Sequence, residues 1–72
     1  LKPGRGLTPM GPTSSESMHG AAVQGVVSRT VRDTAAMLDV ICGGEPSGPY
    51  LPELPEAPFR SAVGRDPGQL RI

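Results

Sequence analysis

The sequence predicts one helix within an extended, turn-rich piece of a larger α/β protein. A complete set of helix signals stands between residues 28 and 44, and short apolar segments typical of strands accompany long stretches rich in glycine and proline. The 72 residues include ten Gly and nine Pro but one Tyr, one Phe and no Trp, less aromatic mass than small autonomous folds usually bury. We therefore expect the chain to pack against structure outside itself.

Charge and cysteine content argue against several classes of protein. Seven basic and seven acidic residues cancel, and the basic ones are scattered, whereas phosphate binding needs clustered Lys and Arg. A single cysteine excludes an internal disulfide and gives no metal-ligand spacing. No apolar run approaches the roughly 20 residues that span a bilayer. We expect no nucleic-acid or membrane partner, no cofactor, no metal site and a cytoplasmic location.

The N-terminal part is predicted to be a strand end at Leu1, a winding loop and a short buried extended segment. Glycine and proline alternate through residues 1–12, which disfavours both a helix and a central strand. Residues 21–27, AAVQGVV, are apolar and partly β-branched, and Gly25 permits a bend within them. This segment is expected to lead directly into the helix.

Two motifs in this loop superficially suggest functional sites. Gly4-Arg5-Gly6 lacks the further glycine, the Lys-Ser or Lys-Thr ending and the following helix that a phosphate-binding loop needs. Residues 13–20, TSSESMHG, place three serines beside His19, but no acid that could orient a base is identifiable. We interpret this segment as a solvated, turn-forming loop. The sequence therefore predicts no catalytic, cofactor-binding or metal-binding residue in the chain.

The helix itself is predicted at about residues 31–42. Thr30 can accept a hydrogen bond from a first-turn amide, and Asp33 can reach back to complete a capping box and complement the helix dipole. Gly43 and Gly44 tolerate a left-handed conformation and are expected to end the helix before Pro46. One broad apolar arc, expected to be buried, collects Val31, Thr34, Ala35, Met37, Leu38, Ile41 and Cys42.

Arg29 and Cys42, near the two ends of the helix, each have a structural interpretation. Arg29 is either an exposed charge or a guanidinium that forks onto a carboxylate or backbone carbonyls and fixes the loop. Cys42 is predicted to be a buried structural thiol, because a helix C-terminus raises a thiol pKa and does not lower it.

The C-terminal part is predicted to be irregular up to a final strand. Residues 45–58 contain five prolines and no periodicity, which indicates an extended connection with polyproline character. Within it, PELP formally matches a PxxP ligand but lacks neighbouring basic anchors. A helical turn is expected at residues 59–63 and should end at Gly64. Asp66-Pro67-Gly68 predicts a turn before an incoming strand at residues 70–72.

The order and spacing of these motifs resemble the amidase signature family, just downstream of its Gly/Ser-rich signature. The matching positions are Leu1-Lys2-Pro3, Arg5-Gly6, Gly11, Gly25, residues 29–39 (RTVRDTAAMLD) and Gly43, and the turn before residues 70–72 is similar to that family's lead into its next strand. The chain departs from the family at Gly4, Leu7 and Val26, where Thr or Ser, Arg and Pro are usual.

The resemblance implies that residues 1–72 are a partial amidase domain, truncated at both ends, from a mixed-sheet α/β/α core. Such enzymes hydrolyse carboxamides to a carboxylate and ammonia or an amine through a Ser, cis-Ser, Lys arrangement, with glycine-rich backbone amides holding the oxyanion. The resemblance places those three residues before Leu1, and it does not make Lys2 the catalytic lysine. The isolated chain is therefore predicted to be inactive.

The parent protein would then take a small-molecule amide, and a homo-oligomer is a possible assembly. Two alternatives stay open at this point. The parent could be the amidase-type subunit of a tRNA-dependent amidotransferase, which shares the fold. Alternatively, the chain could be a non-enzymatic interaction segment that presents the helix and the proline-rich connection.

Overall fold

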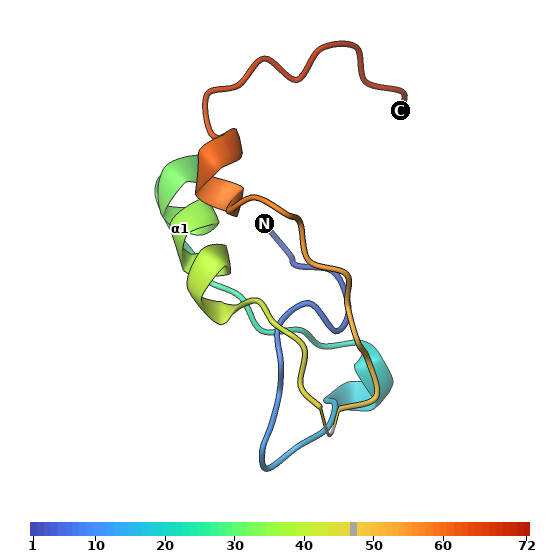
Figure 1. Cartoon of the computed structure of the whole chain (residues 1–72). Coiled ribbons are helices and arrows are strands. Elements are labelled where there is room, and N and C mark those ends of the chain that lie inside the picture. The colour runs from blue at the N-terminus through green and yellow to red at the C-terminus, as the bar shows by residue number, and fades with distance from the viewer. Residues whose placement is uncertain (47) are drawn as a thin grey trace.

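In the computed structural model, the chain forms one α-helix and two short 3-10 helices joined by long irregular segments (Figure 1). The structure describes residues 1–46 and 48–72. The elements are η1 (Met18–Gly20), α1 (Val31–Ile41) and η2 (Phe59–Ala62). Within the described residues, the strand-type pairing is an isolated antiparallel bridge between Ser17 and Ala22. The mixed sheet expected from the sequence therefore stays a prediction.

The start of α1 confirms the cap predicted from the sequence. Thr30 is extended (φ −130°, ψ 152°), and its hydroxyl accepts a hydrogen bond from the Asp33 N–H at 3.0 Å. This bond satisfies one of the amides that have no partner within the helix. The last helical residue is Ile41, one position before the predicted end.

The glycine stop predicted for the other end of α1 is wrong. Cys42 leaves the helix in an extended conformation (φ −74°, ψ 140°), while its N–H still donates to the Leu38 carbonyl at 2.9 Å. The next amide, of Gly43, donates to the Leu7 carbonyl at 3.1 Å. Neither Gly43 nor Gly44 adopts a positive φ. The helix ends here because the chain turns away to pair with the N-terminal loop.

The apolar arc of α1 is only partly covered. Ala35 and Leu38 are buried, at 7% and 6% exposed. Thr34, Ile41 and Cys42 are half-buried, but Val31 and Met37 are exposed, so the expectation of a wholly buried arc is wrong for these two. The cover comes from η2, which lies directly against α1 (Figure 1).

The remaining segments agree with the sequence in part. η2 falls within the predicted turn, which Gly64 follows with a φ of 83°, and Gly68 has a φ of 64° and donates its N–H to Asp66 Oδ1 at 2.9 Å. Residues 21–27 are irregular beyond the bridge at Ala22, and Val27 is fully exposed, which corrects the expectation of a buried segment. Residues 70–72 pair with no strand in the described part of the chain, so the incoming strand stays a prediction.

Candidate functional site

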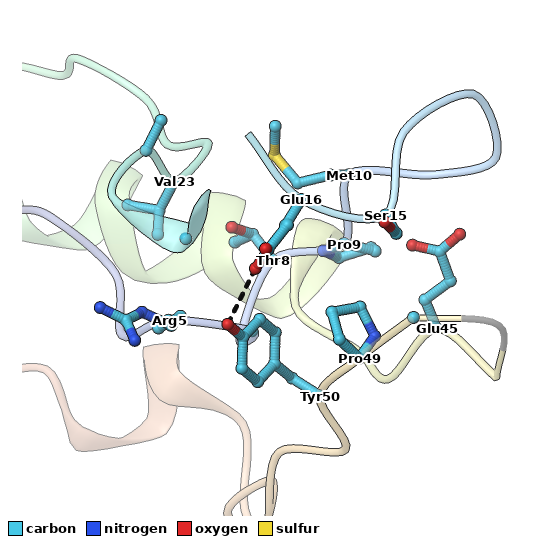
Figure 2. Close-up of a pocket in the computed structure, with 14 residues that line it drawn as sticks. Arg5, Thr8, Pro9, Met10, Ser15, Glu16, Val23, Glu45, Pro49 and Tyr50 are labelled. Atoms are coloured by element: carbon cyan, nitrogen blue, oxygen red, sulfur yellow. Dashed lines mark hydrogen bonds between the residues drawn. The ribbon is translucent and has the colours of Figure 1, made fainter. Parts of the chain in front are cut away.

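A small, partly enclosed cavity lies where the N-terminal loop, η1 and the start of the proline-rich connection meet (Figure 2). Its volume is about 30 Å³. That is enough for about one water molecule and far below the roughly 300–1,000 Å³ of small-molecule sites. The polar and charged residues that line it include Arg5, Thr8, Glu16, Glu45 and Tyr50. The cavity cannot hold an organic substrate, so its importance lies in the contacts that surround it.

Tyr50 bridges the two ends of the η1 turn. Its hydroxyl donates to Glu16 Oε2 at 2.9 Å, and the bond joins positions 34 residues apart (Figure 2). Its side chain lies against Gly6, where an added Cβ would come within 2.9 Å of Tyr50 Cγ. At Gly20 an added Cβ would come within 3.0 Å of the same hydroxyl oxygen. The tyrosine therefore needs glycine at position 6, and a Cβ at position 20 would be in tight contact with its hydroxyl.

Glu45 makes a second bridge across the same region. Its carboxylate oxygen Oε2 accepts a hydrogen bond from the Gly11 N–H at 2.9 Å. A Cβ at Gly11 would overlap this carboxylate. A further tie comes from Thr8, which is 4% exposed and donates its hydroxyl to the Gln24 carbonyl at 3.0 Å. Together these bonds hold the N-terminal loop between the segments on either side of α1.

The η1 turn that they enclose has an uncommon backbone. Met18, His19 and Gly20 all lie in the left-handed region, with φ values of 50°, 52° and 76°. Glycine adopts this region freely, but residues with a Cβ do so at a cost. Three backbone bonds close the turn: Gly20 N–H to Ser17 O at 3.0 Å, Ala21 N–H to Met18 O at 3.0 Å and Ala22 N–H to Ser17 O at 3.3 Å. Met18 and His19 are nevertheless exposed.

The serines and histidine of this segment do not form a nucleophile and base pair in the described structure. His19, Ser14 and Ser15 are exposed, as expected for a solvated loop. The Ser14 hydroxyl donates to the Glu16 carbonyl at 2.9 Å, a local bond that stabilises the loop. Arg29 is exposed and makes no hydrogen bond or ion pair within the described ranges, so the first of its two interpretations holds here.

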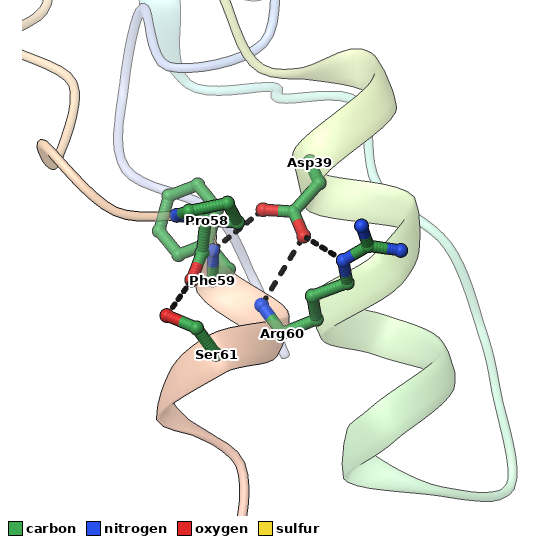
Figure 3. Close-up of polar contacts among 5 residues, drawn as sticks. All are labelled: Asp39, Pro58, Phe59, Arg60 and Ser61. Carbon is green, nitrogen blue, oxygen red and sulfur yellow. Dashed lines mark hydrogen bonds and ion pairs between the residues drawn. The ribbon is translucent and has the colours of Figure 1, made fainter.

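A second polar cluster joins α1 to η2. The Asp39 carboxylate accepts the Phe59 N–H at 2.5 Å and the Arg60 N–H at 3.2 Å (Figure 3). These are free amides at the start of η2, so the carboxylate takes the place of a cap. The Arg60 guanidinium lies 3.9 Å from the same carboxylate but its side chain is 72% exposed. The cluster holds two elements together and contains no nucleophile.

Cys42 lies half-buried at the end of α1, close to this cluster. Burial, and secondarily the negative charge of Asp39, raises the pKa of its thiol. A raised thiol pKa lowers the fraction of reactive thiolate. The structure thus agrees with a structural role for the cysteine, although its burial is less than expected.

Neither a metal site nor a membrane span is found in residues 1–46 and 48–72. No three His, Cys, Asp or Glu side chains gather there in a way that could hold a metal ion. No helix of this part of the chain is long and apolar enough to cross a membrane.

The roles of Tyr50, Glu16, Glu45 and Asp39 were not predicted from the sequence. Each forms a hydrogen bond with a partner at least 20 residues away in the sequence, and a local sequence pattern does not predict such a contact. The available signal was Tyr50 itself, an isolated aromatic in a proline-rich stretch, together with glycines in the N-terminal loop against which a large side chain can pack.

Comparison with other proteins points to an amidase-like family. The chain is similar along its whole length to proteins described as hydrolases and an amidase. It is 39% identical over 74 residues to the 6-aminohexanoate-cyclic-dimer hydrolases of a Pseudomonas strain and of Paenarthrobacter ureafaciens. It is 41% identical over 72 residues to a Synechocystis protein described as "Putative amidase".

The match covers a small part of each relative. The chain spans 15% of the length of the two cyclic-dimer hydrolases and 14% of the Synechocystis protein, while all of the chain is matched in each case. No family model matches the chain, and no solved structure does. The comparisons therefore support a segment of an amide hydrolase.

Proposed function

We propose that the chain is part of an amidase of the amidase signature family, which hydrolyses carboxamide C–N bonds to a carboxylate and ammonia or an amine. The observation that carries the proposal is the 39–41% identity over the whole chain to proteins described as a cyclic-dimer hydrolase and an amidase. The order of motifs from Leu1 to Gly43 supports the same family.

The mechanism belongs to the proposal as well. The nucleophilic serine, the cis-serine and the lysine that activates them would lie outside these 72 residues. One feature of the described residues supports this division. No serine in this part of the chain contacts a base, because the serine hydroxyls that form hydrogen bonds there meet backbone carbonyls or Thr34. Residues 1–72 would then support the catalytic segment without taking part in the chemistry.

The proposed substrate is a small carboxamide, and the relatives suggest which ones to try first. Two of them are named for hydrolysis of the cyclic dimer of 6-aminohexanoate, whose amides are secondary. We propose a cytoplasmic enzyme that accepts such secondary amides, and the assay should compare them with a simple primary amide.

The test is to sequence the coding region upstream of Leu1 and to assay the full-length protein. A glycine/serine-rich run with a serine nucleophile, and release of ammonia or amine without tRNA, are the expected results. Replacement of that serine by alanine should abolish turnover and serves as the control. Release that requires tRNA and a partner subunit would instead identify an amidotransferase subunit. Absence of the glycine/serine-rich run would overturn the proposal and favour an interaction segment.

A further inference from the structure

The left-handed turn Met18–Gly20 needs a restraint beyond its own backbone bonds. Two of its residues, Met18 and His19, carry a Cβ and have positive φ values of 50° and 52°. A non-glycine residue in this region is strained and persists when its surroundings impose it. The local bonds of the turn come from residues 17–22 alone, and Met18 is 74% exposed. Burial of its side chains therefore does not hold the turn.

Tyr50 and Glu45 supply contacts of the kind required. The Tyr50 hydroxyl donates to Glu16, just before the turn, and packs against Gly20, its last residue. Both ends of the turn thus meet one side chain from a distant segment. Glu45 fastens the same segment to Gly11 by a second hydrogen bond at 2.9 Å. Glu45 and Tyr50 thus attach the proline-rich connection at two positions.

Glycines in the N-terminal loop allow Tyr50 and Glu45 to come close. Side-chain atoms of Tyr50 at Gly6, and of Glu45 at Gly11, occupy the space in which a Cβ would stand. Gly4 and Gly64 offer a contrast, because nothing lies within 4 Å of a Cβ added at either position. Two glycines are thus used for close approach, which a merely flexible loop would not require.

We infer that Glu45 and Tyr50 form a latch that fixes the backbone of the η1 turn. The latch ties the proline-rich connection to the N-terminal loop and to the residues that lead into the turn. This role does not depend on the proposed hydrolase activity.

Hydrogen exchange in the full-length protein tests the latch. Tyr50→Phe removes the hydroxyl and keeps the ring, and the amides of Gly20, Ala21 and Ala22 should then exchange roughly five- to tenfold faster, as for the loss of one hydrogen bond. The Cys42 amide, which is bonded within α1, should be unchanged and shows that the variant is folded. Glu16→Gln keeps an acceptor oxygen and should exchange nearly as the parent does, whereas Glu16→Ala should match Tyr50→Phe.

Two matched pairs of glycine variants separate the latch from general backbone strain. Gly6 and Gly64 have φ values of 77° and 83°, so alanine is equally strained at both, but Tyr50 stands against Gly6 alone. Gly6→Ala should therefore speed exchange in the η1 turn and Gly64→Ala should not. Neither Gly11 nor Gly4 has a positive φ, but the Glu45 carboxylate lies against Gly11 alone. Gly11→Ala should therefore speed exchange in the η1 turn, and Gly4→Ala should not. Equal exchange in the η1 turn within both pairs, or no change in Tyr50→Phe, would overturn the inference.

Discussion

The chain contains two regions that are held together in opposite ways. α1 and η2 are regular helices, yet the buried apolar side chains they contribute are Ala35 and Leu38. The loops around Tyr50 have almost no regular structure (Figure 1). Side-chain hydrogen bonds nevertheless join distant positions of these loops at several points (Figure 2). The regular region is thus poorly covered, while the irregular region is restrained by its own contacts.

From this difference we propose that the region formed by α1 and η2 packs against structure beyond the chain. An open, mainly apolar groove of about 190 Å³ runs along α1 and η2 and is lined by side chains such as Leu1, Val31 and Val63. A short helix is marginal without packing of its apolar face. The loop region around Tyr50 should keep most of its stability without such cover, because its hydrogen bonds and close contacts lie within the chain. Substitutions in the full-length protein can test this contrast directly.

Leu38→Ala should have the largest effect on stability. Leu38 is 6% exposed, and truncation of a buried leucine costs about 2–5 kcal/mol through lost burial and the cavity left behind. Chemical denaturation of the full-length protein measures the change. Val40→Ala is the matched control, since Val40 is 77% exposed in this chain and should cost within about 0.5 kcal/mol. A comparable loss at Val40 would show that the rest of the protein covers both faces of α1.

Asp39→Ala should rank second. The carboxylate accepts two N–H groups at the start of η2, and hydrogen bonds to charged groups are worth about 1.5–3 kcal/mol. Arg60→Ala removes the exposed ion pair and keeps both backbone bonds, so it should change the free energy of unfolding by less than about 0.5 kcal/mol. Equal losses for the two variants would mean that the ion pair, and not the amide contacts, joins η2 to α1.

The sequence predicts the regular region well because its signals are local. The Thr30 cap, the extent of α1, the turn that became η2 and the Asp66 turn are each encoded within a few residues. The helix stop was mispredicted because the Gly43 amide pairs with Leu7, 36 positions earlier. The latch escaped prediction for the same reason: Tyr50, Glu16, Glu45 and Gly11 meet only in three dimensions. Val31 and Val27 were expected to be buried, but no residue in the described part of the chain covers them.

Thr30→Ala should destabilise the full-length protein by about 0.5–2 kcal/mol, because the cap on the Asp33 amide is lost. Thr30→Ser keeps a hydroxyl in the same place and should recover most of this loss. Thermal unfolding followed by circular dichroism compares the three proteins. No difference between Ala and Ser would show that the cap adds little once α1 is packed in the full-length protein.

The smallest expected effect concerns Cys42, whose thiol should react with an alkylating agent in a way that depends on pH. Burial, followed by the charge of Asp39, raises the thiol pKa, so alkylation by iodoacetamide near pH 8 should be slower than for a cysteine in the unfolded chain. The Cys42 thiol therefore keeps its proton to a higher pH in the folded state than in the unfolded state. The stabilising effect of the neutral thiol is therefore complete below the unfolded pKa and is lost as the pH rises through the folded pKa.

Asp39→Asn separates the two causes of this shift. The amide keeps an oxygen that can accept the Phe59 N–H but carries no charge, so alkylation of Cys42 should become somewhat faster without reaching the rate of the unfolded chain. Burial is the larger cause and remains. Alkylation at the unfolded rate in the unmodified protein would show that the end of α1 is open to solvent, and the regular region would then be covered even less than its groove indicates.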